Sequence, residues 1–279
     1  MSSNKKEIES LVQTWRNSGI DEGDTILIHS SIKRTMQDIT NKGIPFNADD
    51  LLQSFIEAVG INGTLVFPLF NFNFKEDKFF DINKTISHMG LLTETARLHP
   101  KSERTGHPMY SFCAIGKESN KFKIIDNKSA YGKDSPFNLI RELGGKIGVL
   151  DLEEQLSMTF YHHVEEMNNV DYRYHKDFEG IYVDEFGVSS EKTYSIFVRD
   201  LDRNIKTNVN PAGELLWKNG LYKGDRPYVN SGLRTIDANE IFRFLSKIIT
   251  DGNALGNFYY IGDWNEWKKI CNSEKKFGE

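Results

Sequence analysis

The sequence predicts an α/β domain in which helices are layered against a sheet. Amphipathic helical segments alternate with short apolar strands over the first half of the chain, the pattern of a layered α/β domain. The 279 residues are 38% hydrophobic and 12% aromatic, enough to fill a sizeable core. No internal repeat and no linker rich in proline, glycine or serine interrupts the chain. We therefore expect one domain over residues 1–263 and a charged C-terminal tail over residues 264–279.

Local signals place the elements of the first half. The helices share apolar residues at intervals of three and four, and they are expected at residues 5–18, 48–59, 91–98 and 135–143. Gly19 follows the first helix and Pro100 follows the third, as terminating residues often do. Asn47 or Asp49 caps the second helix. The strands share short apolar runs, and they are expected at residues 24–29, 63–69, 110–115 and 147–152.

The second half has a different order of elements. Residues 179–188 and 193–200 read as paired strands around a turn at Glu185-Phe186-Gly187, which predicts a hairpin at the edge of the domain. A short helix that opens with proline, a long amphipathic helix and a last strand follow at residues 211–219, 237–250 and 257–261.

Charge and composition exclude several classes of protein. The net charge of −5 argues against a general nucleic-acid binder, which is usually basic. Cys113 and Cys271 are too far apart for a disulfide framework or a zinc motif. The N-terminus is polar, and no apolar run approaches the roughly 18 residues of a membrane span. We expect a cytoplasmic protein that binds neither nucleic acid nor membrane.

A histidine with a carboxylate one helical turn away is the main chemical signal. Ser157 is a typical N-cap residue, so we expect a helix to begin there. On that helix Thr159, His162 and Glu165 would share one face. An imidazole held by a carboxylate is a general base with a fixed tautomer. The alternative is a packed histidine bonded to Glu165 or Glu166, and spacing alone favours this alternative.

The adjacent histidines do not predict a metal site. Neighbouring helix positions diverge by roughly 100°, so His162 and His163 cannot easily share one ion. The sequence also lacks the His-Glu-x-x-His motif and other metal-ligand spacings, so we expect no metal. His163, on a different face from His162, is expected to be a packing or substrate-side residue.

Three other segments carry dense polar or aromatic groups. His29-Ser30-Ser31 at a strand end suits a phosphate or a polar cofactor arm, or is only a serine-capped turn. The loop from Arg104 to Ser111 holds arginine, histidine, tyrosine and serine, and it either carries function or braces the fold. The run from Phe67 to Phe74 alternates aromatic and amide groups. It fits a stacking wall for a sugar or base, or an edge strand with alternate phenylalanines buried.

Together these segments resemble the aminoglycoside 3-N-acetyltransferase family, the antibiotic N-acetyltransferase superfamily. The motifs occur in the family's order over roughly residues 5–260. They are Gly23-Asp24-Thr25 to His29-Ser30-Ser31, Gly63-Thr64-Leu65-Val66-Phe67-Pro68, Arg104-x-x-His107-Pro108-x-x-Ser111, Gly132-x-x-Ser135-Pro136 and Thr159-x-x-His162-x-x-Glu165. The resemblance implies a mixed sheet layered with helices, and an acetyl-CoA-dependent N-acetyltransferase that needs no metal.

The resemblance also implies roles for individual residues. His162 would be the base and Glu165 its orienting partner, with Thr159 in the same catalytic group. The residues expected to bind acetyl-CoA are His29, Ser30, Ser31, Lys33, Arg104, His107 and Ser111. Arg34 is a further candidate for neutralising its phosphates. The residues expected to bind the substrate are Phe70, Asn71, Phe72, Asn73, Tyr110 and Glu166.

The substrate region looks less like that of the drug-resistance members. The Phe70–Phe74 run and the His107–Phe112 segment look more like members from surface-polysaccharide (O-antigen) biosynthesis, which acetylate nucleotide-linked deoxyamino sugars. We therefore expect such an amino sugar as substrate. An aminoglycoside is the alternative, and its positive charges favour a site with several carboxylates. A non-catalytic protein that binds CoA or a sugar is an alternative of another class.

Overall fold

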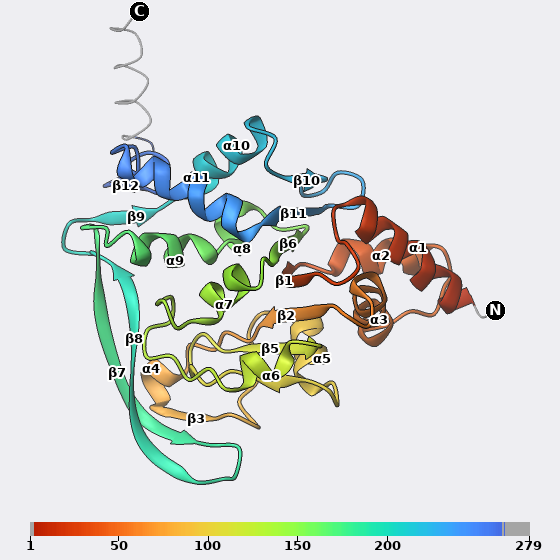
Figure 1. Cartoon of the computed structure of the whole chain (residues 1–279), viewed down its shortest axis with the longest axis horizontal. Coiled ribbons are helices and arrows are strands. Elements are labelled where there is room, and N and C mark those ends of the chain that lie inside the picture. The colour runs from red at the N-terminus through yellow and green to blue at the C-terminus, as the bar shows by residue number, and fades with distance from the viewer. Residues whose placement is uncertain (1–2, 264, 266–279) are drawn as a thin grey trace, which may run out of the picture.

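A seven-stranded mixed sheet forms the centre of the protein (Figure 1). The computed structural model describes residues 3–263 and 265. The strand order is β10-β11-β6-β1-β2-β5-β4, in which β6, β1 and β2 are parallel and the other pairs are antiparallel. In this order the strands are Lys223–Gly224, Leu233–Asp237, Lys146–Leu150, Thr25–Ser30, Thr64–Pro68, Phe112–Gly116 and Glu103–Arg104. The α/β class with a mixed sheet is therefore confirmed.

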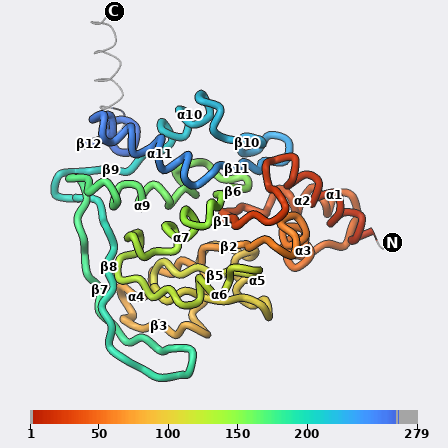
Figure 2. Tube along the Cα trace, in the orientation of Figure 1, coloured from red at the N-terminus to blue at the C-terminus, as the bar shows by residue number. Residues whose placement is uncertain are grey.

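Two hydrophobic cores lie on opposite faces of this sheet. Ile26 and Ile28 of β1 belong to one core and Leu27 to the other, as the alternation of side chains along a strand requires. The helices α1, α2, α3 and α5 contribute to the first core, and they span Ser3–Asn17, Lys33–Asn41, Ala48–Val59 and Leu91–Leu98. The helices α7, α9, α10 and α11 contribute to the second, and they span Pro136–Glu142, Phe160–Met167, Asn210–Lys218 and Ala238–Thr250. Within this second layer α9 packs against both α7 and α11 (Figure 2).

The predicted hairpin is confirmed and is longer than expected. Its strands are β7 (Arg173–Val183) and β8 (Ser189–Arg199), and they run along one side of the molecule past the central sheet (Figure 1). Asp184 orders the turn, because its Oδ1 accepts hydrogen bonds from the amides of Phe186 and Val188. The short strand β3 (Phe79–Asp81) adds to β7 in parallel.

Several short elements complete the described chain. They are α4 (Phe74–Asp77), α6 (Ser119–Lys123), α8 (Glu154–Ser157), β9 (Ile205–Thr207) and β12 (Tyr259–Ile261). Strands β9 and β12 pair with each other outside the central sheet. No helix among the described residues is long and apolar enough to cross a membrane. The expected charged tail at residues 264–279 lies, except for Asn265, outside the described residues.

The helix expected to start at Ser157 is divided into two, so this prediction is wrong. Ser157 is the last residue of α8, and its Oγ donates to the carbonyl of Glu153 at 2.7 Å, which removes it as an N-cap. The next helix, α9, begins at Phe160 with Thr159 at the N-cap position. The turn between the two helices changes only the starting point, and the residues from 160 to 167 are helical as expected.

The N-terminus of α3 offers a test of this fold. Asn47 Oδ1 accepts from the amide of Asp50, and Asp50 Oδ2 accepts from the amide of Asn47, each at 3.0 Å. Asn47→Ala removes one half of this capping box, so we expect the free energy of unfolding to fall by about 1 kcal/mol. Urea denaturation measures this change. Gln53→Ala, at an exposed site in the same helix, is the control. Equal effects of the two substitutions would contradict the assigned cap.

Candidate active site

The site is built at the edge where two parallel strands end. Ser30, the last residue of β1, pairs with Leu150, the last residue of β6. The carboxyl ends of neighbouring parallel strands form a crevice in which ligands commonly bind. The segment from Ser31 to Arg34 leaves this edge after β1, and α8 and α9 follow β6. The fold therefore brings two of the predicted motifs, those at residues 29–34 and 159–165, to one edge of the sheet.

His162 and Glu165 form a pair on α9. His162 Nδ1 lies 2.7 Å from Glu165 Oε2. The Glu165 side chain is fully buried, whereas the His162 side chain is 22% exposed. With Glu165 ionised, Nδ1 carries the proton and donates it to the carboxylate, which leaves a lone pair on Nε2. Among the described residues none bonds to Nε2, so this nitrogen is available to a ligand.

Arg173, the first residue of β7, approaches the same carboxylate. Its Nε lies 2.8 Å from Glu165 Oε2, the oxygen that His162 also contacts. Its Nη1 donates to the carbonyl of Phe197 at 3.1 Å, and its Nη2 donates to Thr207 Oγ1 at 3.2 Å. The hairpin therefore holds a fixed positive charge against the pair.

Burial and charge act against each other in this pair. Burial and the positive charge of Arg173 lower the pKa of His162 below its ordinary value, although Glu165 acts to raise it. Burial acts to raise the pKa of Glu165, but Arg173 and the hydrogen bond from His162 outweigh it and lower that pKa. At neutral pH the site thus holds a neutral imidazole beside an ionised carboxylate, the state that a general base requires.

A chain of aromatic rings extends from His162 to the segment after β2. The ring of Tyr131 lies 5.2 Å from that of His162, and the ring of Tyr110 lies 4.9 Å from that of Tyr131. Tyr110 in turn contacts Phe70 at 4.7 Å and Phe72 at 5.5 Å. Phe70, Phe72 and Tyr110, three of the expected substrate residues, are therefore connected to the His162–Glu165 pair through Tyr131, which the sequence did not single out.

A cavity of about 660 Å³ is lined by Glu166, the residue that follows Glu165 on α9. Glu166 Oε2 accepts from Ser129 Oγ at 2.8 Å, and Oε1 lies 3.9 Å from His175 Nε2. Burial raises the pKa of Glu166. The residues that line the cavity are Lys128, Ser129, Gly132, Lys133, Asp134, Glu166, Met167, Asn169, His175, Asp177 and Ser195. Three carboxylates and two lysines line it, and Lys128 Nζ lies 3.9 Å from Asp177 Oδ2, which leaves Asp134 and Glu166 as the carboxylates that a cationic ligand could meet.

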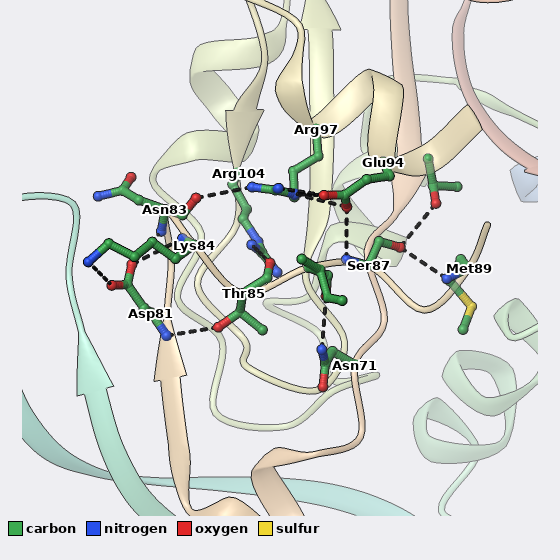
Figure 3. Close-up of polar contacts among 12 residues, drawn as sticks. Asn71, Asp81, Asn83, Lys84, Thr85, Ser87, Met89, Glu94, Arg97 and Arg104 are labelled. Atoms are coloured by element: carbon green, nitrogen blue, oxygen red, sulfur yellow. Dashed lines mark hydrogen bonds and ion pairs between the residues drawn. The ribbon is translucent and has the colours of Figure 1, made fainter. Parts of the chain in front are cut away.

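Arg104 and Ser111 are bonded to each other inside the protein. Arg104 Nε and Nη2 donate to Ser111 Oγ at 3.2 and 3.0 Å, and Nη1 donates to the carbonyls of Ile82 and Thr85. Figure 3 shows Arg104 beside Thr85, among the polar contacts that connect the segment after β3 to α5. Burial lowers the pKa of Arg104 to about 10. These contacts are those of a brace between loops.

The two histidines of the expected cofactor site are buried. His107 Nδ1 accepts from the amide of Tyr110 at 3.1 Å, and burial lowers the pKa of His107 to about 4. His29 Nε2 is buried without a hydrogen-bond partner among the described residues. Burial and the charge of Arg234 lower the pKa of His29 to about 3. Both histidines are therefore neutral at physiological pH.

The remaining cofactor candidates are more accessible. Ser30 and Ser31 are half-buried, and Lys33 is exposed at the start of α2. Arg34 is engaged, because its Nη1 lies 3.2 Å from Asp151 Oδ1 and its Nη2 donates to the carbonyl of Asn230. Ser30, Ser31 and Lys33 thus remain open to a phosphate at the carboxyl end of β1.

The phenylalanine run is not an edge strand, so that interpretation is wrong. Its first part belongs to β2, which lies between β1 and β5 in the sheet. Phe70 and Asn71 are each 3% exposed, and Asn71 Nδ2 donates to the carbonyl of Ile86 at 2.9 Å. Phe72 and Asn73 are accessible, and Lys75 Nζ lies 4.9 Å from the Phe72 ring. Only Phe72 and Asn73 of this set present surface to a ligand.

His163 is a packing residue, the first of its two predicted roles. Its side chain is fully buried, its Nδ1 bonds to the carbonyl of Tyr131 at 2.7 Å, and its Nε2 lies 3.3 Å from Arg141 Nη1. Burial lowers the pKa of His163 to about 4. Within the part of the chain that the structure describes, no group of three or more histidine, cysteine, aspartate or glutamate side chains is placed to hold a metal.

Substitution of Arg104 separates its bracing contacts from cofactor binding. Arg104→Met leaves two carbonyls and the Ser111 hydroxyl without their donor, so we expect the free energy of unfolding to fall by about 2–4 kcal/mol. In the folded variant we expect the affinity for CoA to stay within about twofold, as measured by calorimetry, because the guanidinium is directed to Ser111, Ile82 and Thr85. Lys101→Met, at an exposed site in the preceding turn, is the control for stability. A large loss of CoA affinity at unchanged stability would instead make Arg104 a cofactor contact.

Solved structures of other proteins are similar to this one. The structure of AAC-IIIb in a binary complex with CoASH is 20% identical to this chain, with a TM-score of 0.74, and the match covers 88% of this chain and 96% of that one. The neutron and X-ray structure of sisomicin-bound AAC-VIa is 19% identical, with a TM-score of 0.69, and covers 88% and 98%. These likenesses show that the fold is shared.

A curated relative and a family model extend the comparison to sequence. The SPbeta prophage-derived aminoglycoside N(3')-acetyltransferase-like protein YokD of Bacillus subtilis (strain 168) is 28% identical over 135 residues. This match covers 40% of the present chain and 47% of the relative, about half of its length. The model of the aminoglycoside 3-N-acetyltransferase family matches residues 27–250, which include the segment at residues 29–34 and the His162–Glu165 pair. The chain therefore belongs to the aminoglycoside 3-N-acetyltransferase family.

Proposed function

We propose that the protein is an acetyl-CoA-dependent N-acetyltransferase that acetylates an amine of an aminoglycoside-type amino sugar. The observation that carries this proposal is the pair of His162 Nδ1 and Glu165 Oε2 at 2.7 Å. The pair leaves the Nε2 of a partly exposed, neutral imidazole open, and such a group can accept a proton from an amine. Membership of the family and the cavity with three carboxylates support the same function.

The reaction is a direct acyl transfer. A sugar amine is protonated near neutral pH and attacks only after His162 Nε2 has taken a proton from it. The amine nitrogen then forms a bond to the thioester carbonyl carbon and loses a second proton to solvent, and the carbon–sulfur bond breaks to release CoA as its thiolate. Glu165 stabilises the imidazolium, which returns its proton to the departing thiolate.

No acyl-enzyme is required, because the bound amine and thioester can meet directly. Cys113 does not supply a nucleophile. It is fully buried, and burial raises the pKa of its thiol to about 12, so the thiolate is absent at neutral pH.

Acetyl-CoA fits the accessible groups at the carboxyl end of β1. Ser30, Ser31 and the exposed Lys33 would hold its phosphates with hydroxyls and one positive charge. Thr159, half-buried at the N-terminus of α9, would offer its hydroxyl to the thioester carbonyl, where negative charge develops. The bound acetyl-CoA supplies the acyl group for transfer.

The cavity favours an aminoglycoside over a nucleotide-linked sugar. The expectation of a nucleotide-linked sugar rested on the Phe70–Phe74 run and the His107–Phe112 segment, but Phe70, Phe74 and His107 are buried. Asp134 and Glu166 instead offer carboxylates in the cavity that Glu166 lines, and a polycationic sugar would gain from them. A nucleotide diphosphate would meet these charges unfavourably.

A thiol-release assay with acetyl-CoA tests both the reaction and the substrate. The panel contains kanamycin-type drugs and thymidine- or uridine-linked amino sugars, and we expect faster release with the drugs. Faster release with a nucleotide-linked sugar would reverse the choice of substrate. If no amine released thiol while calorimetry showed CoA binding, the protein would be a non-catalytic binding protein. Lack of any CoA binding would contradict the acetyltransferase proposal as a whole.

Substitutions at the pair test the role of each residue. We expect His162→Ala and His162→Asn to lower kcat by about 10²–10⁴-fold while CoA binding survives, because the general base is lost. Glu165→Gln should lower kcat less, since the imidazole remains. His88→Asn, at an exposed site, is the control. Near-normal turnover in either His162 variant would contradict the assignment.

The pH dependence of kcat/KM reports the same base. His162 accepts a proton only when it is neutral, and its pKa is lowered by burial. Activity should therefore hold as the pH falls through the ordinary histidine value of about 6.5 and decline only at lower pH. The measurement is kcat/KM for the amine from pH 5 to 8, at amine concentrations below saturation. A decline centred well above pH 6.5 would show a protonated imidazole in the free enzyme.

A further inference from the structure

Arg173 is the group through which the hairpin reaches the catalytic pair. Its side chain is 5% exposed, and its Nε lies 2.8 Å from Glu165 Oε2. Its two other nitrogens donate to the carbonyl of Phe197 on β8 and to Thr207 Oγ1 on β9. Two strands from outside α9 therefore fix the guanidinium before any ligand arrives.

One carboxylate oxygen serves both of its neighbours. Glu165 Oε2 lies 2.7 Å from His162 Nδ1 and 2.8 Å from Arg173 Nε. The other oxygen, Oε1, is buried and has no hydrogen-bond partner among the described residues. Protonation of His162 would place two cations against one carboxylate in a buried site, an excess of positive charge that low polarity disfavours.

We propose that Arg173 is a positioning residue that holds the Glu165 carboxylate and offsets its charge, so that His162 is neutral and ready to accept a proton at neutral pH. Without the guanidinium, Glu165 would face His162 alone and would stabilise the imidazolium more strongly, already in the free enzyme. The base would then be occupied by a proton before the amine binds. This inference rests on the proposed function, in which His162 is the base.

The other groups around the pair do not supply this charge. The titratable groups that face it are Tyr110, Tyr131, Glu166, Tyr172, Arg173 and Arg199. Burial raises the pKa of each tyrosine, so all three stay neutral. Glu166 accepts a hydrogen bond from Ser129 and lines the cavity. Arg199 lies opposite Arg173 in the hairpin register but is exposed, so solvent screens its charge.

Titration of the ligand-free protein tests the inference. The midpoint of His162 is followed by NMR of its ring C–H signal, which is assigned by its absence in His162→Asn. In Arg173→Met we expect the midpoint to rise by about 1 pH unit or more, and the acid limb of kcat/KM to rise with it. Arg173→Lys, which keeps the charge, should restore most of the wild-type midpoint. Arg199→Met is the matched control and should leave the midpoint within a few tenths of a unit.

An unchanged or lower midpoint in folded Arg173→Met would overturn the inference. If circular dichroism shows that this variant is unfolded, Arg173→Gln replaces it, because the amide keeps N–H donors for Phe197 and Thr207. A wild-type midpoint above about 6.5 would also overturn the inference. The titration needs no substrate, so failure of acetyl transfer would reject the proposed function and leave this result distinct.

Discussion

The parallel pairing of β1 with β6 positions the two segments that carry the proposed cofactor-binding serines and the His162–Glu165 pair. Ile26, Leu27 and Ile28 are fully buried, so β1 contributes to the cores on both faces and its register cannot shift without exposing one of them. That register sets Ser30 against Leu150. The serines after β1 and the two helices after β6 then start from the same edge. The segment after β1 can supply phosphate-binding groups at this edge and α9 can supply a base, although the two are far apart in sequence.

Arginines that are buried or half-buried connect several segments of the protein, and their partners determine what each one does. A guanidinium cannot lose its proton inside a protein, so it must be paired or fully hydrogen-bonded. Arg104 bonds to carbonyls and a hydroxyl, and Arg234 meets Glu154 at 3.1 Å. Arg173 alone among these three contacts a carboxylate that also bonds to the proposed base. An arginine that elsewhere only connects segments therefore also sets the charge beside the proposed base where it contacts Glu165.

The sequence predicted best what depends on neighbours along the chain. The bounds of α3 and α5, the hairpin and the one-turn spacing of His162 and Glu165 follow from local periodicity and caps. Strand β11 was missed because Arg234 interrupts its apolar pattern, and only the tertiary contact with Glu154 makes that arginine a buried residue. Arg173 was missed for a similar reason. It meets Glu165 only because the hairpin folds back toward α9, and no spacing in the sequence encodes that contact.

The choice of substrate depends on the charges that line the cavity and not on the net charge of the whole chain. A net charge of −5 over the whole chain does not distinguish a polycationic sugar from a nucleotide sugar. The aromatic run after β2 favoured the nucleotide-linked sugar. Aromatic residues that follow a central strand often pack in the core, however, and Phe70 and Phe74 are buried in it. The charges that matter to a substrate are those that line the cavity it enters. Asp134, Glu166 and Asp177 line one cavity, so the charges there favour an amine even though the overall charge is small.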